Sequence, residues 1–96
     1  MLMEQSITLN VPINLSPEDW RRVAAIYETL DGWMADPNGA YWYGREGDVR
    51  YIWASAEPSG LLFCGRVEPR LWCGWITVLC SRLSLAFARE VHDAEM

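Results

Sequence analysis

The sequence contains no lysine and a single histidine, and these absences exclude several kinds of chemistry. All eight basic residues are arginines, so lysine Schiff-base catalysis is excluded. His92 and three cysteines (Cys64, Cys73 and Cys80) show no CxxC pair and no close ligand spacing, so we expect neither a metal ion nor another cofactor. Glycine-rich phosphate motifs and serine-centred nucleophile motifs are also missing. We therefore expect a protein without catalytic residues, which is not an enzyme.

Long apolar runs that would favour a membrane are also missing. Segment 71–88 comes nearest, but it contains Arg82, which is costly in lipid, and several small or polar residues near one face. We interpret it as a largely buried helix.

The first six residues lack the basic and apolar regions of a signal peptide. We expect a cytoplasmic protein whose cysteines are reduced and buried. The exclusive use of arginine is typical of a GC-rich bacterial genome.

The negative charge is concentrated in the first half of the chain. Residues 1–48 contain eight acidic residues and three arginines, whereas the remainder contains five of each, for a net charge of −5. This acidity disfavours nucleic acid and anionic membranes as partners and suits a basic protein surface, although it also simply aids solubility. With 96 residues, 51% of them hydrophobic, the chain fits a single domain over residues 1–96.

Local patterns predict an α+β fold. Alternation over residues 6–15 predicts a strand that is either at an edge of the sheet or bulged at Pro12, because this proline cannot donate a ladder hydrogen bond. Ser16 and Pro17 predict the start of a helix that ends near residues 32–34, and Pro69 opens a second helix. Three strands are expected between the helices, over residues 40–43, 49–54 and 61–67.

The order β-α-β-β-β-α-(β) predicts an antiparallel sheet of four to five strands with two helices packed on one face. The nearest simple topology is a ferredoxin-like split βαβ with an added hairpin strand. The last element is uncertain in kind: residues 89–93 form either a final edge strand or the fraying end of the second helix.

Aromatic residues in the middle strands give two candidate faces. If the larger aromatic set (Tyr41, Tyr43, Tyr51 and Trp53) faces the helices, the side of the sheet away from the helices carries the following residues: Trp42, Arg50, Ile52, Leu62 and Arg66. An exposed Trp42 beside two arginines suits a protein hot spot, a stacking platform for nucleic-acid bases, or an ordinary solvated face. The acidity of the chain disfavours the nucleic-acid interpretation.

A second candidate surface lies on the helix that Pro69 opens. Leu71, Val78 and Leu85 recur every seven residues, away from the expected core face, between small residues such as Gly74 and Ser81. Such a stripe favours a partner helix. We expect either that the first helix covers it or that it forms the seam of a homodimer.

In its general character the chain resembles the small acidic immunity proteins of bacterial toxin systems. The resemblance rests on the helix start Ser16-Pro17-Glu18-Asp19-Trp20, the strand at residues 60–65 and the Trp72-x-x-Trp75-Ile76 helix. It implies tight one-to-one binding of a toxin, often through acidic residues. We expect a non-catalytic inhibitor that binds a basic protein; the alternative is a small-molecule-binding or minor enzymatic domain with an aromatic pocket between sheet and helices. The expected partner-binding residues are Glu18, Asp19, Glu46, Asp48, Trp42, Arg50 and Arg66.

Overall fold

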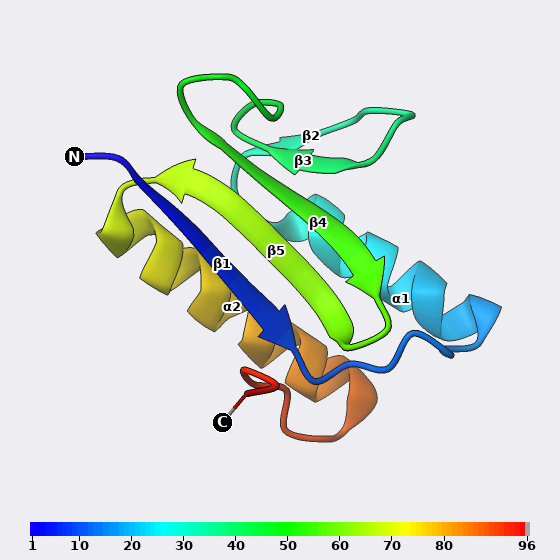
Figure 1. The fold of residues 1–96 in the computed structure, drawn as a ribbon. Coiled ribbons are helices and arrows are strands. Elements are labelled where there is room, and N and C mark those ends of the chain that lie inside the picture. Colours follow the sequence, from blue (N-terminus) through cyan, green and yellow to red (C-terminus); the bar gives the residue numbers. More distant parts are fainter. Residues whose placement is uncertain (96) are drawn as a thin grey trace.

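A computed structural model describes residues 1–95 and shows the expected α+β class. Five antiparallel strands form one sheet, and Figure 1 shows both helices on the same side of it. The elements are β1 (Met3–Leu9), α1 (Pro17–Thr29), β2 (Trp33–Met34), β3 (Ala40–Trp42), β4 (Tyr51–Glu57), β5 (Gly60–Val67) and α2 (Pro69–Phe87). No helix in this part of the chain combines the length and apolar character that a membrane crossing requires.

The strand order differs from the ferredoxin-like expectation, which is wrong. The order is β1-β5-β4-β3-β2, so β2 to β5 follow one another as a meander and β1 adds to the free side of β5. Short connections explain this, because strands joined by a tight turn such as Pro58–Ser59 pair directly as antiparallel neighbours. The position of β1 at an edge confirms the expectation drawn from Pro12, and the strand ends before this proline.

Helix α1 begins as the sequence indicates and ends earlier than expected. The Ser16 hydroxyl accepts a hydrogen bond from the Asp19 N–H at 3.1 Å, and Pro17 occupies the first turn. The helix ends at Thr29, not near residues 32–34, because Leu30 already has an extended backbone (φ −79°, ψ 145°), and Gly32 in a left-handed conformation (φ 86°) then turns the chain into β2. Strand β2 was not predicted; its two residues are ordered by pairing with β3.

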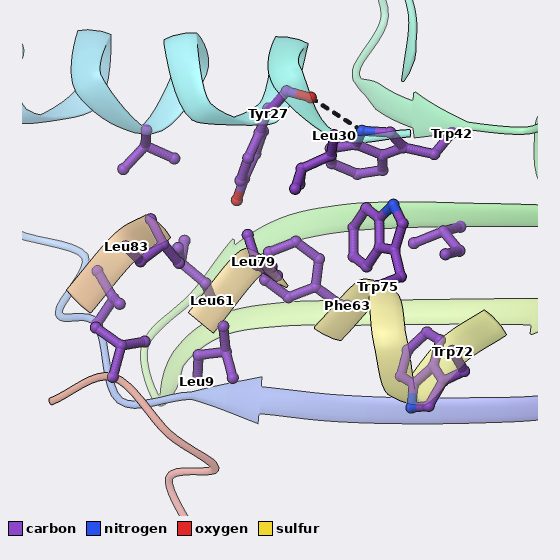
Figure 2. Packing of buried hydrophobic residues seen from close by; sticks show 14 of the residues in the cluster. Leu9, Tyr27, Leu30, Trp42, Leu61, Phe63, Trp72, Trp75, Leu79 and Leu83 are labelled. Atoms are coloured by element: carbon purple, nitrogen blue, oxygen red, sulfur yellow. Dashed lines mark hydrogen bonds between the residues drawn. The ribbon is translucent and has the colours of Figure 1, made fainter. Parts of the chain in front are cut away.

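The core lies between the sheet and the two helices. Trp42 is fully buried and meets Tyr27 of α1 and Trp75 of α2 edge to face, at centroid distances of 5.1 and 4.8 Å. Phe63 of β5 packs against Tyr27 and Trp75 in the same way. Figure 2 shows these rings filling the space between the layers. Edge-to-face pairs add stabilisation of about 0.5–1.5 kcal/mol each beyond the burial of apolar area.

The expected assignment of faces is wrong for Trp42 and Ile52, which both face the helices. The register pairs Trp42 with Ile52 and Ile52 with Gly65, and all three residues are buried. Gly65 suits this position because a Cβ there would come within 2.9 Å of Ile52 and 3.1 Å of Trp72. The hydrophobic alternation of β5 (Leu61, Phe63 and Val67 buried) therefore decides which side of β4 is inward.

The C-terminal segment is neither of the two expected structures. Helix α2 ends at Phe87 with Ala88 in a left-handed conformation, and Leu9 and Asp93 form an isolated antiparallel bridge. Asn10 holds the segment in place, because its side chain accepts from the His92 N–H and donates to the Glu90 carbonyl. The segment therefore covers the end of β1 without adding a strand.

Candidate functional site

The face of the sheet opposite the helices carries a row of aromatic and polar side chains. Tyr41, Trp53, Cys64 and Ser6 are direct partners across β3, β4, β5 and β1. Tyr51, Arg66 and Glu4 form the neighbouring row across β4, β5 and β1. We call these seven residues the open face. No helix covers it (Figure 1), and Tyr41, Tyr51, Trp53 and Cys64 are partly exposed on it.

The loop between β3 and β4 brings Glu46 to this face. The Asp48 carboxylate accepts from the Arg45 N–H at 2.8 Å, and the Arg45 guanidinium pairs with Asp36 at 2.5 Å. Gly44 permits the tight turn, since a Cβ there would lie 2.3 Å from the Arg50 carbonyl oxygen. Glu46 itself forms no ion pair in the described part of the chain and is exposed.

Glu46 and Glu4 border a hollow of about 380 Å³ on the open face. Tyr51, Trp53 and Cys64 also line it, so two carboxylates stand beside an aromatic floor. A smaller hollow of about 140 Å³ shares Glu46 and Trp53 with the first hollow and is also lined by Tyr41. Glu4, like Glu46, has no ion-pair partner within residues 1–95. The arrangement combines shape, aromatic surface and unpaired negative charge.

The pKa shifts of the neighbouring groups show the negative field of these carboxylates. Burial raises the pKa of Tyr51, and the charges of Glu4 and Glu46 raise it further, while Arg66 acts in the opposite direction. Burial and Glu46 likewise raise the pKa of Cys64 above its ordinary value. A raised thiol pKa disfavours the thiolate, so Cys64 suits contact with a partner and not nucleophilic attack.

The residues expected to bind a partner do not form one surface. Glu46 and Arg66 belong to the open face or its rim. Trp42 is buried, and Arg50 makes an ion pair with Glu68 next to the start of α2, so the expected Trp42 platform between two arginines does not exist. Asp48 lies in the same loop as Glu46, but its carboxylate holds the loop together.

Glu18 and Asp19 lie far from Glu46. Both pair with Arg22 in the first turns of α1, at 3.5 Å each. Figure 1 shows the start of α1 and the β3–β4 loop at opposite ends of the molecule. Sequence reasoning missed Glu4, Tyr41, Tyr51 and Trp53 as site residues. The alternation of the aromatic strands identified the last three as sharing one face, but assigned that face to the core.

The cysteines and His92 do not assemble into a catalytic group. Cys73 is exposed and Cys64 and Cys80 are half-buried, so the expectation that all three cysteines are buried is wrong for Cys73 and is met only in part by the other two. Burial and the charge of Asp93 raise the pKa of Cys80. The His92 ring interacts with Asn10 and with the Asp93 carbonyl oxygen. A nucleophilic cysteine requires a lowered pKa, which neither Cys64 nor Cys80 has.

A second concave surface of about 470 Å³ lies between the end of α1 and the outer side of α2. Leu71, Gly74 and Val78 line it from α2, and Tyr43 and Asp31 line it from the opposite side. Tyr43 donates a hydrogen bond to the Asp31 carboxylate at 2.8 Å. Burial, together with this hydrogen bond, raises the pKa of Tyr43.

The sequence and fold were compared with known proteins. No family model, no curated protein and no solved structure matches this chain. The interpretation of the two surfaces therefore rests on their own geometry and chemistry.

Proposed function

We propose that this protein is a non-catalytic binding protein that captures another protein on the open face of its sheet. The observation that carries the proposal is the hollow in which unpaired Glu4 and Glu46 flank the rings of Tyr51 and Trp53. Tyrosine and tryptophan are enriched among residues that dominate protein interfaces. An inhibitor or immunity-type role, in which tight binding neutralises a cognate partner, suits such a surface and agrees with the resemblance noted in the sequence.

The partner we propose presents a basic segment to this face. An arginine or lysine side chain that enters the hollow would lie against the Trp53 ring and between the two carboxylates. Cation–π contact contributes about 0.5–2 kcal/mol, depending on how fully the cation is desolvated. The acidic first half of the chain would steer such a partner from a distance, and nucleic acid is disfavoured because the same carboxylates repel phosphates.

A small-molecule pocket between sheet and helices has less support as an alternative. The rings of Trp42, Phe63 and Trp75 occupy the centre of that space (Figure 2). The larger hollows lie at the surface. A cytoplasmic location remains our proposal, and the three free cysteines agree with it because thiols persist in a reducing compartment.

The test is affinity capture from a bacterial lysate with matched baits. Wild type should retain one stoichiometric basic protein, whereas Trp53→Ser and Glu46→Arg should lose it. Glu90→Arg is the control, because it makes the same charge change after α2, on an exposed residue away from the open face. Binding of the purified partner is then measured by calorimetry. Equal affinity of all four baits would show that the open face is not the interface, and the capture of no protein would contradict a binding role.

A further inference from the structure

Helix α2 carries an apolar stripe that is symmetric about the middle of the helix. The helix spans 19 residues from Pro69 to Phe87, and Val78 is its midpoint. Leu71 and Leu85 lie seven residues before and after Val78, which is about two turns in each direction. All three side chains therefore emerge along one side of the helix, with a drift of about 20° per seven residues.

The chain itself covers only one end of this stripe. Leu71 is partly buried against the core, whereas Val78 is 41% exposed and Leu85 is 82% exposed. The expectation that α1 covers the stripe is therefore wrong for Val78 and Leu85. Fully burying an aliphatic side chain of this size is worth about 1.5–3 kcal/mol. Leu85 projects from the surface as a knob without a hole in its own chain.

The hole lies at the opposite end of the stripe. The groove of about 470 Å³ between α2 and the end of α1 is lined by Leu71, Gly74 and Val78, together with Trp75 and Tyr43. The groove is open at Gly74, where an added Cβ would have no atom within 4 Å. The groove runs along α2 from Leu71 past Val78 to Arg82. Its Leu71 end lies seven residues before Val78, as far from it as Leu85 lies after it.

We propose that a second copy of this chain covers the stripe, with the two α2 helices packed antiparallel about a two-fold axis at Val78. In this arrangement Leu85 of each copy enters the groove beside Leu71 of the other, and Val78 meets its counterpart on the axis. Two-fold interfaces require this kind of self-complementarity, in which one patch supplies both knob and hole. Seven-residue apolar spacing is the spacing of helices that pack against each other over several turns.

The charges agree with this arrangement. Arg82 and the exposed Asp31 of one chain line the same groove, so it carries one charge of each sign, and antiparallel pairing sets Arg82 of one copy opposite Gly74 of the other. Antiparallel helices also place opposite ends of their dipoles together. Within its own chain Arg82 donates to the Thr29 carbonyl at 3.0 Å, so its position at the edge of the stripe is already held. The open face lies on the other side of the sheet and stays free (Figure 1).

Analytical ultracentrifugation over a range of concentrations tests the proposal. Wild type should sediment as a dimer, and Leu85→Glu should raise the dissociation constant by roughly 30-fold or more, as expected for a residue that dominates an interface. Thr77→Glu is the matched control, because Thr77 is exposed on a different side of α2. Its dissociation constant should stay within about threefold of wild type. A wild-type chain that remains monomeric at millimolar concentration would overturn the proposal.

A crosslinking experiment keeps the proposal testable if Leu85→Glu fails to fold. In a Cys73→Ser background, Val78→Cys should form a disulfide-linked dimer under mild oxidation, because position 78 meets itself on the axis. Thr77→Cys in the same background should stay largely uncrosslinked. Equal crosslinking at positions 77 and 78, or none at 78, would rule out the antiparallel seam.

Discussion

The indole N–H of Trp42 donates a 3.0 Å hydrogen bond to the backbone carbonyl of Tyr27, at the end of α1. Two further side chains serve the carbonyls that follow: Arg82 donates to Thr29 and Trp75 donates to Asp31, each at 3.0 Å. The last carbonyls of a helix lack the usual donor one turn further on. Here the Leu30 N–H reaches the Tyr27 carbonyl at 3.3 Å, and side-chain donors from β3 and α2 supply the other bonds at this end of α1. These bonds tie α1 to both the sheet and α2.

Replacement of Trp42 should destabilise the protein strongly. Trp42→Phe removes the donor, leaves the Tyr27 carbonyl with the 3.3 Å bond from the Leu30 N–H, and puts a smaller ring at a fully buried position, which together should lower the free energy of unfolding by about 1–3 kcal/mol. Trp42→Ala should cost about 3–5 kcal/mol because it also leaves a cavity. Urea unfolding measures both. Trp53→Phe on the open face is the control and should cost less than about 1 kcal/mol; a similar loss for the two Trp→Phe variants would contradict the observed faces.

Replacement of two glycines by alanine should change the free energy of unfolding in opposite directions. Gly65→Ala should lower the free energy of unfolding by about 1–3 kcal/mol, because its Cβ would lie 2.9 Å from the Tyr51 carbonyl oxygen and the Ile52 side chain. Gly74→Ala should raise it by about 0.5–1 kcal/mol, since position 74 is mid-helix with free space around it. Thermal melting at low protein concentration, where any dimer has dissociated, compares them. A stable Gly65→Ala variant would show that β5 is not packed this closely.

Alkaline pH should destabilise the fold through its buried phenols. Burial raises the pKa of Tyr27 and Tyr43 above the ordinary value of 10.0, so the unfolded chain releases these protons first. The stabilisation by the neutral phenols is complete below pH 10 and is lost progressively as the pH rises toward the folded-state pKa. Urea midpoints should therefore fall above pH 10. Tyr43→Phe should show a shallower fall than wild type, whereas an identical slope would indicate that Tyr43 is solvated.

The three cysteines should differ in reactivity. Cys73 is exposed and should react rapidly with a thiol reagent, while Cys64 and Cys80 are only partly exposed and the pKa of both thiols is raised by desolvation. In the native protein we expect one fast thiol and two slow ones, and in denaturant without reductant all three should react. Cys73→Ser should remove the fast phase alone. Three thiols with equal native rates would contradict the packing of Cys64 and Cys80.

Most of the secondary structure could be predicted from the sequence, because the signals for it are local. Ser16 and Pro17 mark one helix start, Pro69 marks the other, and the turn at Pro58–Ser59 separates two strands. A capping hydroxyl or a proline acts within its own turn of chain and needs no distant partner. The fold class, an antiparallel sheet with two helices on one face, followed from the order of these elements.

Which face of β4 points inward depends on contacts between residues that are distant in the sequence. Side-chain alternation along β4 places Trp53 and Ile52 on opposite faces of the sheet. It does not indicate which of the two faces is buried. The choice was made by Gly65, which pairs with Ile52 and leaves room for Trp72, and by Trp42, whose indole N–H reaches a carbonyl of α1. Strand β2 and the approach of Glu4 to Glu46 likewise depend on residues distant in sequence. Long-range pairing and packing set these features, and neither leaves a pattern in the local sequence.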